Sequence, residues 1–493
     1  MPDPKQLFRQ HLREIQTLHG ALAVLGWDQE VTMPAGGARN RAAQRSVLAG
    51  IIHERVTAPA LGAVMDDLAA RDDLTAGEAA NLRVFGLQRD RAVKLPERLV
   101  TDLAEAVGLA QPDWVRARQD GDWDLFAPHL QRIVALKREE AAALALGDEP
   151  YDSLLDEYEP GARTAQLVPV FADLRRRLTD LLSRIDTSGH PTLPAVPYAI
   201  DDQLLLSREV LAGMGYSFEH GRLDTSAHPF TESLGHGDVR ITSRFMADEP
   251  LSGLSSTMHE GGHALYEQGL PADLSDTPAG QSTSLGIHES QSRLWENHVG
   301  RGLPYCQWLA PRLRQAFPEQ LPELTAEELY LASNRVAATP IRTDADEVTY
   351  NLHIILRLEL ERALLNGDLE VADVPAAWRE QTLDLLGIDI PDVARGPLQD
   401  IHWSMGALGY FPTYTLGNLY AAMFWNAARA ELPALDDQLA RGDCAPLLAW
   451  LRLKVHQRGS LETAEQLCRN ITGHDLRADD FIAYLGTKFG IDR

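Results

Sequence analysis

The sequence predicts a mainly α-helical protein. Ala, Leu, Glu, Arg and Gln recur along the chain, and apolar residues are spaced about 3.6 residues apart in stretches such as 39–56 and 114–143. Hydrophobic residues make up 44% of the 493 residues, which is enough for a sizeable core. The chain has no fixed-period repeat, so we expect one large helical body rather than a solenoid.

Prolines and glycines mark the breaks between the expected helices. The segment MPAGG (33–37) ends the first helical stretch, and GYFPTYTLG (409–417) interrupts a later one. The segment 187–201 carries three prolines and cannot be helical, so it divides an N-terminal helical region (1–186) from a second region (187–493) within one continuous fold. The segment DVRITSRF (238–245) alternates apolar with polar side chains and predicts a short β-strand.

The charge balance and the cysteines exclude several classes of function. The formal net charge of −25 predicts repulsion from phosphate backbones and anionic lipids, so we expect neither a nucleic-acid nor a membrane partner. Three scattered cysteines argue against a disulfide framework and against a Cys-type zinc site. The N-terminal stretch is charged and no apolar run approaches the length of a membrane span, so we expect a cytoplasmic protein without a signal peptide.

The segment TMHEGGHALYEQG (257–269) has the spacing of a metal site. His259 and His263 are four residues apart, so on a helix both imidazoles lie on one face and can reach one Zn²⁺. Glu260, beside the first histidine, is placed to take a proton from metal-bound water as a general base. A set of two nitrogen ligands and one oxygen ligand also accepts Co²⁺ or Mn²⁺.

A catalytic zinc needs a third protein ligand and one open position. The helix-like run GIHESQSRLWENHVG (286–300) offers three candidates, namely Glu289, Glu296 and His288. Glu289 follows His263 by 26 residues, which leaves room for a turn and an antiparallel return helix. Helical periodicity does not choose between Glu289 and Glu296, because they are two turns apart.

The two glycines between the histidines need an explanation, because each costs a helix about 1 kcal/mol relative to alanine. One hypothesis is that Gly261 and Gly262 allow a neighbouring strand or a substrate backbone to approach the metal closely. The alternative is close packing against another helix. We expect the first.

Several further motifs follow one another along the chain. They are HPF (228–230), DVRIT (238–242), HES (288–290), IR with AD (341–346) and GYFPTY (409–414). Together with HEGGH they resemble the carboxypeptidase Taq family of zinc metallocarboxypeptidases, and the resemblance covers essentially the whole chain.

This resemblance implies a fold, an activity and two roles. The fold is almost entirely helical, with a deep substrate groove and a small β-sheet beside the HEGGH helix, and is commonly a homodimer. The activity is the release of single C-terminal amino acids from peptides with a free C-terminus, with one Zn²⁺ per chain. The resemblance also implies that Glu289 is the third metal ligand and that Glu260 is the general base.

A carboxypeptidase must bind the terminal carboxylate of its substrate. Arg342 is our candidate, because a guanidinium binds a carboxylate through two parallel hydrogen bonds. The alternative is a structural ion pair with Asp344 or Asp346. Tyr410 and Tyr414 flank a proline, so we expect both on a rigid non-helical turn.

The remaining candidates have weaker signals. A phenol of Tyr410 or Tyr414 can donate to the oxyanion or to the carboxylate, unless both rings are simply core. Asp238 and Arg240 share a strand face and either orient a metal-ligand imidazole, bind the substrate backbone, or form a structural ion pair. His228, in an extended segment, and His402 are further candidates for the substrate site.

Two other functions would fit parts of this pattern. A helical zinc endo-oligopeptidase shares the metal motif, but it has no need of Arg342 and cleaves a peptide with an amidated C-terminus. A non-enzymatic scaffold with a vestigial metal site has no use for the base Glu260. The sequence therefore favours a metallocarboxypeptidase.

Overall fold

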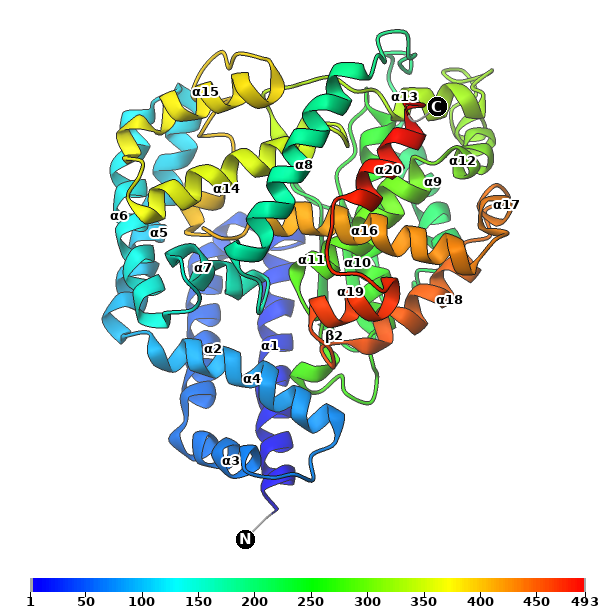
Figure 1. Cartoon of the computed structure of the whole chain (residues 1–493). Helices are drawn as coiled ribbons and strands as arrows, with labels where there is room; N and C mark the ends of the chain where they lie inside the picture. Colours follow the sequence, from blue (N-terminus) through cyan, green and yellow to red (C-terminus); the bar gives the residue numbers. More distant parts are fainter. Residues whose placement is uncertain (1–2, 492–493) are drawn as a thin grey trace.

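The computed structural model describes residues 3–491 and confirms the mainly helical fold class (Figure 1). The helices are α1 (Pro4–Val31), α2 (Ala38–Thr57), α3 (Pro59–Ala69), α4 (Ala76–Lys94), α5 (Glu97–Asp120), α6 (Trp123–Leu144), α7 (Pro150–Tyr158), α8 (Thr164–Arg184), α9 (Ile200–Met214), α10 (Pro250–Gly269), α11 (Leu285–Arg293), α12 (Leu303–Ala316), α13 (Ala326–Ser333), α14 (Tyr350–Asn366), α15 (Val374–Leu386), α16 (Pro412–Glu431), α17 (Leu435–Leu439), α18 (Ala445–Lys454), α19 (Ala464–Thr472) and α20 (Asp479–Lys488). Among the described residues, no single helix is long and apolar enough to cross a bilayer; α2, with the turn before it, and α3 meet that test only as a pair bent by 42°.

The helices enclose two apolar clusters of very different size. Helices α1 to α4 share a small cluster that includes Phe8, Ile52, Leu61 and Phe85, and they extend below the main body in Figure 1. The other cluster runs through the rest of the molecule, on both sides of the predicted boundary after residue 186. The proline-rich segment 187–199 is non-helical, as predicted, and joins α8 to α9.

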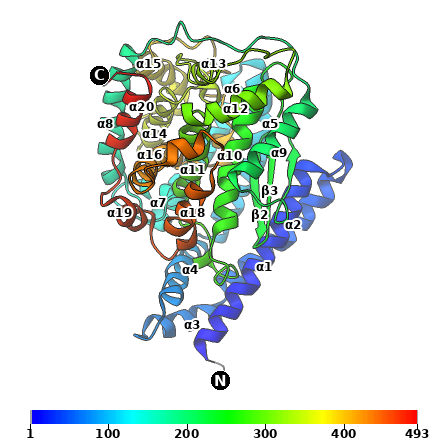
Figure 2. The same ribbon diagram turned by 90° about the vertical axis from the view of Figure 1, so that its right-hand side faces the viewer.

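The small sheet lies between α1 and α10 (Figure 2). Its strands are β1 (Leu223–Thr225), β2 (Phe230–Gly235) and β3 (Asp238–Ser243), in the order β1-β3-β2. Strand β3 runs parallel to β1 and antiparallel to β2, with Thr231 opposite Ile241. The strand predicted at 238–245 is therefore confirmed, and it lies beside the helix that carries HEGGH.

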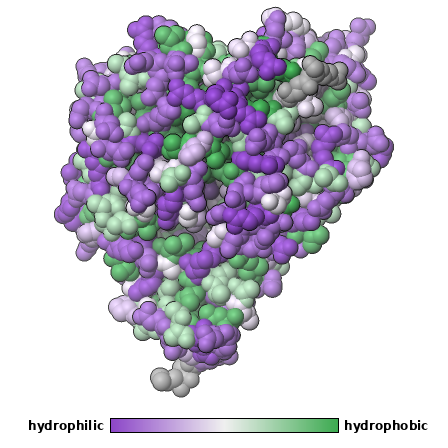
Figure 3. All heavy atoms as spheres, viewed as in Figure 1, coloured by the Kyte–Doolittle hydropathy of each residue, from purple (hydrophilic) through white to green (hydrophobic). Residues whose placement is uncertain are grey.

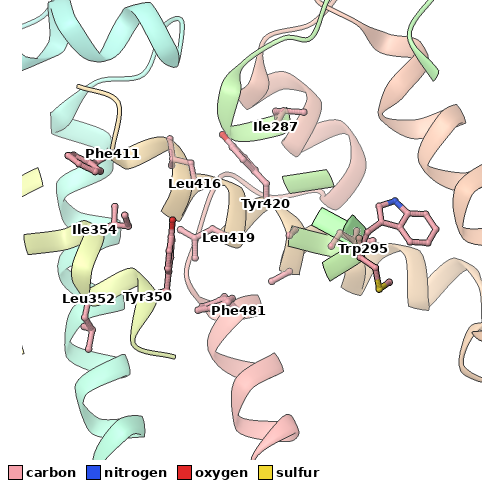
Figure 4. Packing of buried hydrophobic residues seen from close by; sticks show 14 of the residues in the cluster. Ile287, Trp295, Tyr350, Leu352, Ile354, Phe411, Leu416, Leu419, Tyr420 and Phe481 are labelled. Atoms are coloured by element: carbon pink, nitrogen blue, oxygen red, sulfur yellow. The ribbon is translucent and has the colours of Figure 1, made fainter. Parts of the chain in front are cut away.

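Helix α16 crosses the centre of the molecule and packs against α11 and α14. Figure 4 shows Leu416, Leu419 and Tyr420 of α16 lying between Ile287 of α11 and Ile354 of α14, and all five side chains are buried. Outside this core, hydrophilic residues cover most of the face seen in Figure 3, which is hollowed near its middle. The core thus holds the elements that carry the sequence motifs in fixed positions.

One local expectation about helices was wrong. The break expected over 409–417 is only partial, because α16 begins at Pro412 and Tyr414 lies in its first turn. Proline is favoured at the first helical position, where its missing N–H costs nothing. The helical spacing predicted over 114–143 is confirmed, and the stretch is divided between α5 and α6 at Gly121, whose φ of 68° favours glycine.

Candidate active site

Helix α10 places the two histidines of HEGGH on one face, as their spacing requires. The imidazole centroids of His259 and His263 are 4.9 Å apart. Their Nε2 atoms lie 3.5 and 3.3 Å from the same carboxylate oxygen, Oε2 of Glu289 on α11. One ligand atom from each of these three side chains lies within 4.8 Å of the other two, which is the separation expected around a shared cation.

The carboxylate of Glu289 is buried and held on both oxygens. Arg293 donates from Nε to Oε1 at 2.7 Å, and Ser292 donates from Oγ to Oε2 at 2.9 Å. Burial alone would raise the pKa of Glu289, but Arg293 and His259 outweigh it and hold the pKa well below its usual range. Glu289 is therefore an anion that already points toward both imidazoles.

The other two candidates for a third ligand, Glu296 and His288, lie on the Nδ1 side of the histidine rings, opposite Glu289. Glu296 lies on the π-helix η3 (Leu294–Gly300), which continues α11. Its Oε2 atom is 2.9 Å from Nδ1 of His259. The carbonyl of His288 lies 3.1 Å from Nδ1 of His263, and the His288 imidazole bonds Glu267 at 2.9 Å. Acceptors at Nδ1 fix the ring orientation and leave Nε2 for a cation.

These residues fit a divalent cation. Two imidazole nitrogens and one carboxylate oxygen form the ligand set of many catalytic zinc sites. Each imidazole has an acceptor on its other nitrogen, so the tautomer that offers Nε2 is favoured at both histidines.

Glu260 lies between the metal-ligand candidates and the sheet. Thr231, near the start of β2, donates from Oγ1 to Oε2 of Glu260 at 2.8 Å. Burial raises the pKa of Glu260 above its usual value. Sequence reasoning missed Thr231, although it directly follows the HPF motif, because nothing in a strand pattern identifies the partner of a particular threonine.

The two glycines of HEGGH serve helix packing, contrary to our expectation. A Cβ on Gly262 would lie 2.5 Å from the carbonyl oxygen of Gln291 and 2.7 Å from Cα of Ser292, both on α11. A Cβ on Gly261 would lie 2.6 Å from Leu211 on α9. The close approach is made by neighbouring helices, and α11 is the helix that carries Glu289.

Arg342 is buried on the 3₁₀ turn η4 (Arg342–Asp344) and is paired with neither Asp344 nor Asp346. Its Nε and Nη2 atoms donate to Oδ1 of Asp400 at 2.9 and 2.7 Å, and Nη1 donates to the Tyr350 hydroxyl at 2.9 Å. Asp400 also pairs with Arg357, which is fully buried. Sequence reasoning missed Asp400, which is 58 residues from Arg342.

Three other predicted residues gather around Arg342. Its guanidinium lies 5.0 Å from the ring centroid of Tyr414, and the Tyr410 and Tyr414 rings are 5.3 Å apart. Nε2 of His402 lies 3.2 Å from the Tyr414 hydroxyl oxygen. Tyr350, whose hydroxyl accepts from Arg342, also places its ring centroid 4.6 Å from the guanidinium of Arg293, the partner of Glu289. The cluster is therefore linked to the candidate metal centre through two side chains.

The structure does not bring His228, Asp238 and Arg240 to this cluster. Asp238 and Arg240 pair with each other at 2.7–2.8 Å, and Arg240 covers the Trp27 ring of α1 at 4.7 Å. Side chains alternate along β3, so this pair lies on the face opposite Ile241, away from α10. His228 is exposed just before β2.

The comparison with known proteins decides the family. A model of the carboxypeptidase Taq (M32) metallopeptidases matches residues 7–489. The chain belongs to this family. It is 44% identical to "Thermostable carboxypeptidase 1" of Thermus thermophilus, over 97% of this chain and 98% of that protein, and 33% identical to "Carboxypeptidase 1" of Bacillus subtilis, over 97% and 96%.

Solved structures agree with the M32 assignment. The M32 carboxypeptidase from Deinococcus radiodurans R1 is 39% identical and superposes with a TM-score of 0.96 over 99% of this chain and 100% of that one. Trypanosoma cruzi metallocarboxypeptidase 1 is 34% identical, with a TM-score of 0.96 over 99% of both chains. The chain is therefore a metallocarboxypeptidase, a peptide hydrolase that uses a metal ion, and the resemblance seen in its motifs is confirmed.

Proposed function

We propose that this M32 chain removes single C-terminal amino acids from peptides with one zinc ion, using His259, His263 and Glu289 as ligands and Glu260 as the general base. The convergence of two Nε2 atoms and one buried carboxylate oxygen beside Glu260 is the observation that carries this proposal. Co²⁺ or Mn²⁺ would fit the same ligand set. When bound, the cation acts as a Lewis acid toward the scissile carbonyl and lowers the pKa of water.

Glu260 supplies the proton transfer in this proposal. Thr231 holds Oε2, which leaves Oε1 to accept a proton from the attacking water and to pass it to the leaving amine. Burial raises the pKa of Glu260 and so makes the carboxylate a better base than an exposed one.

The proposed site for the terminal carboxylate of the substrate is the cluster around Arg342. Two guanidinium groups, those of Arg342 and Arg357, share the single carboxylate of Asp400, so the buried cluster carries one excess positive charge. Asp400 holds the Arg342 side chain in place, which favours pre-organised binding of an anion. The hydroxyls of Tyr410 and Tyr414, beside it, are proposed donors to the substrate.

The test compares a blocked dipeptide with its C-terminal amide and identifies the products by mass spectrometry. We expect release of one amino acid from the free acid, loss of activity on chelation and recovery with zinc. We expect the amide to be cleaved at least about 10²-fold less efficiently, since it cannot pair with a buried guanidinium. Equal cleavage of both would instead identify an endo-oligopeptidase.

Assembly and location are separate proposals. We propose a cytoplasmic homodimer, on the basis of the family resemblance and the acidic, cysteine-poor composition. Light scattering of the purified protein tests the dimer, because a mass near that of one chain contradicts it.

A further inference from the structure

Glu159, at the C-terminal end of α7, is a buried carboxylate that joins two helices of the active site. Its Oε1 atom accepts a hydrogen bond from the backbone N–H of Gly286, in the first turn of α11, and another from Oγ1 of Thr413 at 3.1 Å, in the first turn of α16. A Cβ on Gly286 would lie 2.8 Å from this oxygen, so the glycine makes room for the carboxylate.

No cation of the described chain compensates this carboxylate. Hydrogen bonds from Ser284, Gly286 and Thr413 are its stabilising contacts, and burial raises the pKa of Glu159 to about 7. An unpaired buried carboxylate is costly, so it persists in a fold only where its surroundings hold it. Here the surroundings are the N-terminal ends of two helices, which favour an anion or a strong acceptor.

The spacing of α11 and α16 determines where Glu289 lies. Glu289 is about one turn beyond Gly286 on α11. Its side chain packs directly on α16, since a Cβ on Gly417 would lie 2.4 Å from Cγ of Glu289. A shift of α11 relative to α16 would therefore move the carboxylate of Glu289 away from the histidines.

We propose that Glu159 is a positioning residue for the metal centre. Its Oε1 atom fixes the first turn of α11 against the first turn of α16, and the packed pair of helices fixes Glu289. This inference rests on the proposed ligand set, in which Glu289 is the third ligand.

The experiment measures zinc affinity of the full-length apo protein by competition with a chromophoric chelator. Glu159→Ala removes the shared acceptor, and we expect about 10-fold weaker zinc binding, at the lower end of the effect of outer partners of metal ligands. Glu159→Gln keeps an oxygen at the position of Oε1 and should bind zinc within about twofold of the wild type. Unchanged affinity in Glu159→Ala would overturn the proposal.

Glu361 provides a matched control. It is also a buried carboxylate with a pKa raised by burial to about 7, and it accepts hydrogen bonds from Tyr151, Trp403 and the N–H of Gly409, but none from α11. Glu361→Ala should leave zinc affinity within about twofold. An equal loss in both alanine variants would show general destabilisation and would overturn the proposal.

Two further variants keep the test decisive. If Glu159→Ala does not fold, Thr413→Val cuts only the link to α16 and should weaken zinc binding about threefold; no change would overturn the proposal. His263→Ala tests the ligand set itself, because wild-type affinity in this variant would contradict the proposed function rather than the role of Glu159.

Discussion

At the scale of residues, two buried carboxylates of the site have opposite tendencies to hold a proton. Arg293 and His259 hold the pKa of Glu289 well below its usual range despite burial, whereas burial raises the pKa of Glu260. A permanent anion suits a metal ligand, and a carboxylate that takes up a proton more readily suits a base. The division of roles therefore follows from which of the two has an arginine beside it.

Glu260→Gln should lower kcat by about 10²–10⁴-fold, the usual share of acid–base catalysis. The amide keeps the shape of the side chain and can still accept from Thr231, so one zinc per chain should remain. Metal analysis and steady-state kinetics on the same preparation measure both quantities. Loss of zinc together with activity would mean that Glu260 is a ligand instead.

Arg342→Met should lower kcat/KM for a free-acid peptide by roughly 10²-fold or more, since its guanidinium is the proposed partner of the carboxylate. The penalties for the variant and for the amide substrate should not multiply, because both remove the same interaction. Arg357→Met is the matched control, because Arg357 also pairs with Asp400 but is fully buried. If the penalties for Arg357→Met and for the amide substrate also failed to multiply, Arg342 would not be the specific partner of the substrate carboxylate.

At the scale of elements, HEGGH is a site because α10 packs backbone against backbone with α11. Gly262 meets the main chain of α11, which cannot give way, whereas Gly261 meets the end of the flexible Leu211 side chain. The contact at Gly262 therefore sets the distance between the helix with the two histidines and the helix with Glu289.

Gly262→Val should separate α10 from α11, with a cost of about 1–3 kcal/mol or more in stability and a lower zinc affinity. The melting temperature and the zinc affinity should both fall, although valine has a better helix propensity than glycine. Gly261→Ala is the comparison and should lose less of both, because Leu211 can change rotamer. An active and more thermostable Gly262→Val would contradict this packing role.

Sequence reasoning could predict the features that depend on short spacings. The four-residue spacing of HEGGH and the alternation along β3 gave the paired histidines and the strand. Helical periodicity could not choose between Glu289 and Glu296, because residues seven apart share a helix face. In the structure, Glu296 lies on a π-helix and contacts Nδ1 of His259 rather than Nε2. Only the resemblance of the motifs to the carboxypeptidase Taq family favoured Glu289.

At the scale of the whole molecule, the site depends on contacts between residues far apart in the chain, which no local pattern encodes. Glu159 and Gly286 are 127 residues apart, and Glu361 and Tyr151 are 210 apart. These two buried carboxylates hold both ends of the segment 409–413, which carries Tyr410. The cost of burying them should appear in the pH dependence of stability.

Glu159→Gln should stabilise the protein relative to the wild type more at pH 8 than at pH 5. The pKa of Glu159 is raised by burial from 4.5 to about 7, so below pH 4.5 the carboxyl is neutral in both folded and unfolded chains. Between these values the unfolded chain loses its proton first, so the folded state loses stability as pH rises, by roughly 3 kcal/mol in all. Glutamine does not titrate, keeps the acceptor for Gly286 and Thr413, and escapes this loss. Melting temperatures at saturating zinc across pH 5–8 measure the difference, with Glu319→Gln, an exposed change, as the control. A difference between Glu159→Gln and the wild type that stays constant over this range would show that Glu159 does not titrate there.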